Sequence, residues 1–206
     1  MSLRIGIDFD NTIAGYDAVF AKAAVDMGFL EPGAAGTKAT VRASLLERPG
    51  GEEAWMRLQG RVYGKLMSQA ELLEGVGAFL LRCRDHEVAI VSHKTRHGHF
   101  DPERVDLHEA SRRWLADQGF FAPDRFALSA DRVYFEPSRD AKIARIRALG
   151  CTHFIDDLPE VLGDPAFPAG VIKLLLAPAE TTTATGPYIA CRSWREIADA
   201  VFDHAA

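Results

Sequence analysis

The sequence predicts an α/β fold: a doubly wound, Rossmann-like parallel sheet of five strands with a helical cap inserted after the first strand. Two observations lead to this prediction. Short apolar runs typical of buried strands alternate with segments of helical periodicity, which indicates a parallel sheet. Between the first two runs lies a segment of about 60 residues without a convincing strand, too long for a plain crossover. We therefore expect a core domain at 1–14 and 75–206 and a cap at 15–74.

The elements follow in chain order. The run Leu3-Arg4-Ile5-Gly6-Ile7 predicts a first strand at about 3–8. Inside the cap, apolar residues at helical spacing predict three helices, with Pro32-Gly33 and Pro49-Gly50-Gly51 as breaks between them. These cap helices are expected at 16–27, 37–46 and 52–67.

The core resumes after the cap with alternating helices and strands. Glycines at 119 and 150 end two of the helices, and Ser193 with Glu196 forms a capping box for the last one. A threonine-rich stretch, 181–186, is a candidate loop. The expected core elements are helix 75–84, strand 87–91, helix 104–118, strand 132–135, helix 139–149, strand 152–155, strand 171–176 and a final helix from Ser193 to about Phe202.

Composition limits the classes of function. A net charge of −5 argues against nucleic acid as the main partner and against an anionic membrane surface. No apolar run approaches the roughly 20 residues that span a bilayer, and the N-terminus lacks a signal-peptide apolar region. The three cysteines match neither a disulfide framework nor a zinc pattern. We expect buried free thiols and a cytoplasmic location.

The stretch Asp8-Phe9-Asp10-Asn11-Thr12 is the main chemical signal, because it follows the first predicted strand directly. Two carboxylates this close repel each other, which a bound cation or a retained proton relieves. The alternative is an Asx turn that merely closes the strand. The matching polar residues at later strand ends favour metal-assisted chemistry.

Three further groups of polar residues accompany this stretch. Ser92, followed by His93 and Lys94, ends the second strand of the core, and Asp156-Asp157 ends the fourth. Lys142 lies early in the helix that precedes the fourth strand. Because ligands bind at the carboxyl ends of parallel strands, we expect these groups to meet. Carboxylates and water suit Mg²⁺, while Ser92 and Lys142 suit an anion.

This series of motifs resembles the haloacid dehalogenase-like (HAD) hydrolase superfamily, in the correct order over the whole core. The resemblance implies a phosphatase in which Asp8 is the nucleophile and forms an aspartyl-phosphate. Asp10 would be the general acid and then the base that activates water. Ser92, Lys142, Asn11 and Thr12 would bind the phosphate, with Thr12 supporting the loop.

The resemblance also implies a Mg²⁺ site. Asp8, the backbone carbonyl of Asp10, and Asp157 would hold the ion, and Asp156 would orient Lys142 or a metal-bound water. Val161 stands where the family often has an acidic residue, and the adjacent Glu160 is expected to support the site from behind. His93 and Lys94 are candidate substrate contacts. Lys94 is also the rival of Lys142 for the role of phosphate-binding lysine.

The sequence thus predicts a Mg²⁺-dependent phosphohydrolase that cleaves a small phosphorylated metabolite. A nucleotide 5′-phosphatase and a sugar or polyol phosphatase stay open as narrower forms. The alternatives from other classes are a non-catalytic binding or regulatory protein and a dehalogenase. The resemblance disfavours the dehalogenase, because that branch works without Mg²⁺ and lacks the second Asp of the first motif. The sequence does not determine the substrate, the motion of the cap or the oligomeric state.

Overall fold

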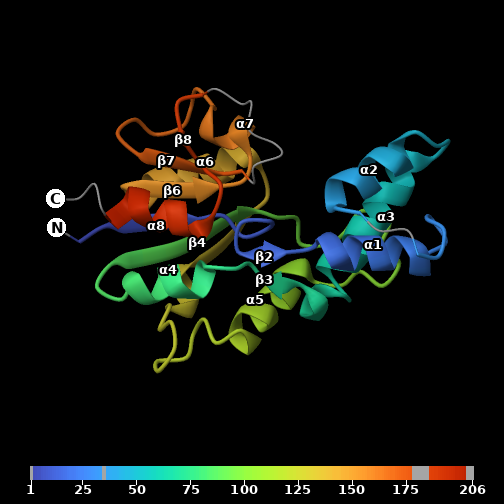
Figure 1. The fold of residues 1–206 in the computed structure, drawn as a ribbon, viewed down its shortest axis with the longest axis horizontal. Helices are drawn as coiled ribbons and strands as arrows, with labels where there is room; N and C mark the ends of the chain where they lie inside the picture. The colour runs from blue at the N-terminus through green and yellow to red at the C-terminus, as the bar shows by residue number, and fades with distance from the viewer. Residues whose placement is uncertain (1, 34–35, 178–185, 203–206) are drawn as a thin grey trace. The chain divides into compact units, whose positions relative to one another are not determined.

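The computed structural model describes residues 2–33, 36–177 and 186–202 of the chain (Figure 1). Contacts within the chain group it into two compact units. The first consists of Met1–Ala14, Leu72–His93 and Gly119–Ala206, and the second of Gly15–Glu71 and Lys94–Gln118.

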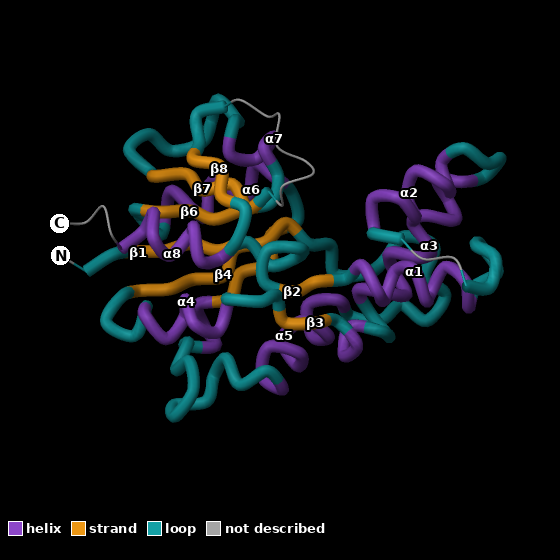
Figure 2. The backbone as a smooth tube through the Cα atoms, viewed as in Figure 1, coloured by secondary structure: helices purple, strands orange, loops and turns teal. Residues whose placement is uncertain are grey.

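A parallel sheet of six strands, counted over the described residues, forms the first unit (Figure 2). The predicted doubly wound parallel sheet is confirmed, but the predicted count of five strands is wrong. The sixth strand has only three residues and lies at an edge, so it carries no periodicity that a sequence pattern can detect. In spatial order the strands are β5 (Val133–Glu136), β4 (Glu87–His93), β1 (Arg4–Ile7), β6 (His153–Asp156), β7 (Ile172–Leu176) and β8 (Ile189–Cys191).

Helices cover both faces of this sheet, as a doubly wound fold requires. On one face, α6 (Arg139–Ala148) and α7 (Pro159–Leu162) contribute Ile143, Ile146 and Leu162 to a buried cluster with strand residues such as Val91 and Phe154. The helices α4 (Val76–Arg82) and α8 (Trp194–Phe202) pack together, with the rings of Phe79 and Trp194 4.9 Å apart (Figure 1). A short 3₁₀ helix, Ala130–Arg132, precedes β5.

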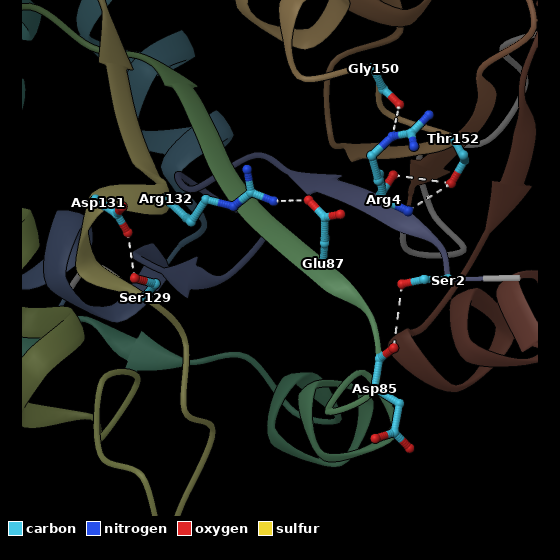
Figure 3. A network of polar contacts seen from close by, with 9 residues as sticks. All are labelled: Ser2, Arg4, Asp85, Glu87, Ser129, Asp131, Arg132, Gly150 and Thr152. Carbon is cyan, nitrogen blue, oxygen red and sulfur yellow. Dashed lines mark hydrogen bonds and ion pairs between the residues drawn. The ribbon is translucent and has the colours of Figure 1, made fainter.

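The amino ends of the strands carry a polar network (Figure 3). Arg4, the first residue of β1, donates from Nε to the carbonyl of Gly150 over 2.5 Å, and Arg132 forms an ion pair with Glu87, the first residue of β4. A cavity of about 210 Å³ lies at this end, lined by residues that include Cys83 and Phe126. The amino ends are therefore occupied by structural contacts, away from the strand ends that carry the predicted motifs.

The second unit is helical. Its core is aromatic: the rings of Phe20 and Trp55 stack 5.1 Å apart, and Tyr63 meets Phe20 and Tyr16 edge to face. The Asp106 side chain caps α5 by accepting a hydrogen bond from the Glu109 amide. The helices of this unit are α1 (Asp17–Asp26), α2 (Lys38–Leu46), α3 (Gly51–Tyr63), the 3₁₀ helix Met67–Gln69 and α5 (Leu107–Asp117).

Two details differ from the sequence expectation. Strands β2 (Ala14–Gly15) and β3 (Glu71–Leu72) form a two-stranded sheet, whereas the sequence predicted no strand between 15 and 74. The segment 94–118 groups with the helical unit, although the sequence analysis assigned it to the core. In the candidate loop 181–186, residues 181–185 lie outside the described residues.

The three cysteines, Cys83, Cys151 and Cys191, are buried free thiols, as predicted. Burial raises the pKa of the Cys83 thiol to about 12 and the pKa of Cys151 to about 11, so that both stay protonated at neutral pH. No helix in the described part of the chain is both long and apolar enough to cross a membrane.

Candidate active site

The pairing register of the strands brings three of the predicted motifs together at the carboxyl ends of the strands. Ile7, the last residue of β1, pairs with Ile90 of β4 on one side and with Ile155 of β6 on the other. Asp8 follows Ile7, and its amide donates to the Ile155 carbonyl over 2.9 Å. Asp156 follows Ile155 and is the last residue of β6, while Ser92 lies two residues beyond Ile90. The carboxyl ends of three adjacent strands thus present Asp8, Ser92 and Asp156 together.

The loop after β1 is a tight turn. Asn11 has a φ of 58°, in the left-handed region that a short polar side chain tolerates. The amides of Ile13 and Ala14 both donate to the Phe9 carbonyl over 3.0 Å, and the Asn11 amide donates back to Ala14. The Thr12 hydroxyl points at Asp8, with 3.5 Å between Oγ1 and Oδ2. The turn therefore folds Thr12 back onto the first carboxylate.

Lys142 lies between two buried carboxylates. Its Nζ is 2.6 Å from Asp8 Oδ1 and 2.6 Å from Asp156 Oδ2, and its side chain is only 1% exposed. Helix α6 delivers it from a start capped by Ser138, whose hydroxyl accepts a hydrogen bond from the Ala141 amide. Such short charge-assisted contacts in a dry environment hold all three side chains in place.

Burial and charge shift the pKa values of this group. Burial raises the pKa of Asp156 to about 7, although the charge of Lys142 opposes that rise. For Lys142, burial favours the neutral amine, but the carboxylates of Asp8 and Asp156 outweigh it and raise the pKa of Lys142 above its ordinary value. The lysine therefore stays charged.

An acidic cluster at the same carboxyl ends of the strands has the composition of a site for a hard cation. Among the described residues, Asp8, Asp156 and Asp157 each offer a carboxylate oxygen, all within 4.8 Å of one another. Lys142 supplies one positive charge against these three carboxylates, which leaves the cluster able to accept a divalent ion. Oxygen ligands of this kind suit Mg²⁺. The residues present therefore fit the predicted metal.

The oxygens of Asp156 are largely taken by the protein. Oδ2 meets Lys142, and Oδ1 accepts a hydrogen bond from the Leu158 amide over 3.0 Å. Asp157 is half-buried, and its Oδ2 accepts from Asn11 Nδ2 over 3.3 Å. Of the two carboxylates, Asp157 is the more exposed.

The other residues predicted for the site differ in burial and in the unit to which they belong. Ser92 is buried, whereas His93, the next residue of β4, is exposed. Asp10 is half-buried in the turn after β1, and Glu160 is exposed in the first turn of α7. Lys94 belongs to the helical unit, where its Nζ lies 4.5 Å from the centre of the Tyr63 ring. The lysine that the fold brings to Asp8 is therefore Lys142.

The structure adds one residue that the sequence analysis did not connect with this site. Trp194, at the start of α8, donates from Nε1 to the backbone carbonyl of Thr12 over 2.9 Å. The sequence indicated only that a helix begins here, because a contact across 182 residues leaves no local pattern. The sequence signal that positions it is the capping box of Ser193 and Glu196.

These groups can act together on an anionic ester. A buried carboxylate whose oxygens are both approached by donors is an oriented nucleophile. A lysine and a site for a divalent cation beside it offset the repulsion between that carboxylate and a phosphate. The fold and this group of side chains bring a buried carboxylate, a charged lysine and an acidic cluster together in one site.

Comparison with known proteins gives the fold a name. No protein-family model matches the sequence, and no curated protein matches it significantly. Solved structures do match over nearly the whole chain. A HAD-family hydrolase from Deinococcus radiodurans with bound phosphate and sodium is 15% identical, with a TM-score of 0.57 over 98% of this chain and 96% of that one.

Two further structures show the range of the fold. A HAD hydrolase from Bacillus subtilis bound to magnesium is 13% identical, with a TM-score of 0.56 over 98% of this chain and 100% of that one. The L-2-haloacid dehalogenase from Xanthobacter autotrophicus, with chloropropionic acid covalently bound, is 15% identical, with a TM-score of 0.55 over the whole of both chains. The protein therefore has the fold of the HAD-superfamily hydrolases.

Proposed function

We propose that this protein is a Mg²⁺-dependent phosphohydrolase that cleaves a small phosphomonoester through an aspartyl-phosphate on Asp8. The observation that carries the proposal is Lys142, buried and 2.6 Å from both Asp8 and Asp156, beside an acidic cluster completed by Asp157. The phosphate bound to the Deinococcus radiodurans protein and the magnesium bound to the Bacillus subtilis protein support it at the level of the fold.

In the first half of the reaction, a carboxylate oxygen of Asp8 attacks the phosphorus and the ester P–O bond breaks. Asp10 gives its proton to the leaving oxygen, and Lys142 and Ser92 stabilise charge on the phosphoryl oxygens. Asp8, Asp157 and the backbone carbonyl of Asp10 would hold Mg²⁺, which when bound would lower the repulsion between the Asp8 carboxylate and the phosphate.

In the second half, Asp10 takes a proton from a water molecule, whose oxygen attacks the phosphorus. The bond between the phosphorus and Asp8 breaks, which releases inorganic phosphate and restores the carboxylate. Asp156 keeps Lys142 in position throughout both halves. Glu160 supports the metal ligands without binding the metal itself. His93 and Lys94 are candidate contacts for the leaving group.

The test is phosphate release from p-nitrophenyl phosphate and from a panel of metabolite phosphates in Mg²⁺. Asp8→Asn keeps the shape of the side chain but removes the nucleophile, so we expect turnover to fall by at least about 1,000-fold. Asp164→Asn is the matched control: Asp164 caps a turn by accepting from the Ala166 amide, and its variant should keep wild-type turnover. Full activity of Asp8→Asn would refute the assignment of Asp8 as the nucleophile.

The dehalogenase in the same fold class makes carbon–halogen cleavage the second candidate. The acidic cluster weighs against it, because a carboxylate that displaces halide from carbon needs no divalent cation. Halide release from 2-chloropropionate without Mg²⁺, with no phosphate release from any ester, would establish the dehalogenase instead. Metal binding with neither activity would establish a non-catalytic protein.

A further inference from the structure

A tryptophan far along the chain contacts the loop that carries Asp8. The indole N–H of Trp194 donates to the Thr12 carbonyl over 2.9 Å. Trp194 is 2% exposed and Thr12 is fully buried. Since water does not reach this contact, the hydrogen bond has no solvent substitute, and its loss would leave the Thr12 carbonyl unsatisfied.

Thr12 links the hydrogen bond from Trp194 to Asp8. Its hydroxyl lies 3.5 Å from Asp8 Oδ2, at the long limit for a hydrogen bond between two oxygens. A small rotation of the Thr12 peptide therefore decides whether the hydroxyl reaches the carboxylate. Asn11, immediately before it, holds a left-handed backbone, so the turn depends on its surroundings for support.

Trp194 is itself held rigidly within the same unit. It is the first residue of α8, whose start is capped by Ser193: the Glu196 amide donates to Ser193 Oγ over 3.3 Å, and Glu196 Oε2 accepts over 2.7 Å from the amide of Arg192, the residue before Ser193. At Gly75, which has a φ of 88°, a Cβ would come within 2.7 Å of the Trp194 Cβ. The indole thus has little freedom to move away from the loop.

We propose that Trp194 is a positioning residue for Asp8, acting through Thr12. Lys142 orients Oδ1 of the carboxylate, and the chain from the Trp194 indole through the Thr12 peptide to the Thr12 hydroxyl orients Oδ2. Both oxygens of the nucleophile are then set before substrate arrives. The inference rests on the proposed function, because it assigns a purpose to the orientation of Asp8.

The first experiment compares Trp194→Phe with the wild type. Phenylalanine keeps an aromatic ring in the cluster with Phe79 but removes the donor. Misplacement of a reacting group by a fraction of an ångström is costly, so we expect kcat for p-nitrophenyl phosphate to fall about 10-fold or more. KM should change less than about two-fold, because Ser92 and Lys142, the proposed phosphate-binding side chains outside this turn, are untouched.

Trp114→Phe is the matched control. Trp114 is also 2% exposed and also donates from Nε1 to a backbone carbonyl, that of Ala70 over 3.0 Å, but in the helical unit. It should show a comparable drop in unfolding temperature with kcat within about two-fold of the wild type. Equal losses of kcat in both variants would assign a structural role to Trp194 and overturn the proposal.

A double-mutant cycle tests the path through Thr12. Thr12→Val removes the hydroxyl at constant shape, and if Trp194 acts through that hydroxyl, adding Trp194→Phe should lower kcat less than two-fold further. Fully additive losses would overturn the path. If Trp194→Phe does not fold, 3-benzothienylalanine at position 194, with sulfur in place of the N–H, makes the same comparison.

The two proposals fail separately. Undiminished turnover by Asp8→Asn would refute the nucleophile, and with it the proposed function. Inactive Asp8→Asn beside fully active Trp194→Phe would overturn only the positioning role.

Discussion

Lys142 supplies the positive charge that the buried carboxylates of the candidate site face. Its ammonium group is buried between Asp8 and Asp156, and its pKa is raised by those two carboxylates despite the opposing effect of burial. Burial raises the pKa of Asp156 to about 7, and the nearby Asp8 carboxylate adds to the rise, because the opposing charge of Lys142 does not compensate the loss of hydration. The stability of the site and its proposed chemistry therefore depend on the same ion pairs.

We expect Lys142→Met to destabilise the protein strongly. Methionine fills a similar volume but leaves the buried carboxylates of Asp8 and Asp156 facing each other. Breaking a buried ion pair costs about 3–5 kcal/mol, so we expect the unfolding free energy to fall by that amount. Urea denaturation in metal-free buffer measures this loss. Lys173→Met is the control: Lys173 donates to the Leu162 carbonyl over 2.7 Å, and its loss should cost about 1 kcal/mol. Equal losses would contradict this account of Lys142.

His153 provides a pH dependence. It lies buried in β6, and burial, with a smaller contribution from His86, lowers the pKa of His153 from its ordinary 6.5. The unfolded chain therefore takes up a proton near pH 6.5, while the folded protein does so only at lower pH. It follows that the unfolding free energy declines as the pH falls below about 6.5.

The measurement is unfolding free energy against pH for the wild type and for His153→Gln. Glutamine keeps a polar side chain without a titrating group, so the variant should show a shallower decline between about pH 6.5 and the lower folded-state pKa. Identical slopes would mean that His153 binds its proton equally in both states.

At the scale of elements, helix α3 and the segment after β4 meet through glycines. A Cβ on Gly98 would lie 2.5 Å from the Gly60 Cα, which is closer than atoms can approach. A Cβ on Gly60 would meet the Asp101 Cβ at 3.1 Å. This close approach helps to explain why the segment 94–118 groups with the helical unit.

Gly98→Ala should therefore destabilise the helical unit by about 1–3 kcal/mol, because the backbone of α3 must move to admit the methyl group. Gly60→Ala is the graded comparison: its contact is looser, and the gain in helix propensity of about 1 kcal/mol offsets part of the strain. Thermal unfolding by circular dichroism measures both, and proteolysis of the 94–106 segment reports the local effect. A larger loss for Gly60→Ala would reverse this order and refute the packing argument.

At the scale of the whole molecule, parallel strands gather residues from distant parts of the chain. Asp8, Ser92 and Asp156 lie at the carboxyl ends of β1, β4 and β6, which are neighbours in the sheet. The carboxylates that meet there repel one another, and a bound cation would relieve that repulsion. Binding of a divalent ion would then be linked to folding.

Mg²⁺ should raise the unfolding temperature of the wild type. At a free ion concentration 100-fold above Kd, the stabilisation is about 2.7 kcal/mol. Asp157→Asn removes one ligand but leaves the contacts of Lys142 in place, so this variant should lose most of the Mg²⁺-dependent shift. Differential scanning fluorimetry with Mg²⁺ and with EDTA measures the shift, and an undiminished shift in Asp157→Asn would exclude Asp157 as a ligand.

Most of the fold was predictable because its signals are local. Apolar runs located the five longer strands of the main sheet. Of the predicted Ser193–Glu196 capping box, the hydrogen bond from the Glu196 amide to Ser193 is present, whereas the Glu196 carboxylate accepts from the amide of Arg192. The strand Ile189–Cys191 was missed because three residues at a sheet edge show no period. The segment 94–118 was expected to be partly helical, and it contains α5, but helical periodicity does not say which unit a helix packs against.

The sequence by itself determined the order of strands and helices and the residue types at the strand ends, because both depend on neighbours along the chain. Tertiary structure alone decided which of these residues meet. It brought Lys142 to Asp8 across 134 positions and Trp194 to Thr12 across 182. Such contacts depend on which strands pair and on how the helices pack against the sheet, and neither is encoded in the spacing of residues within one segment.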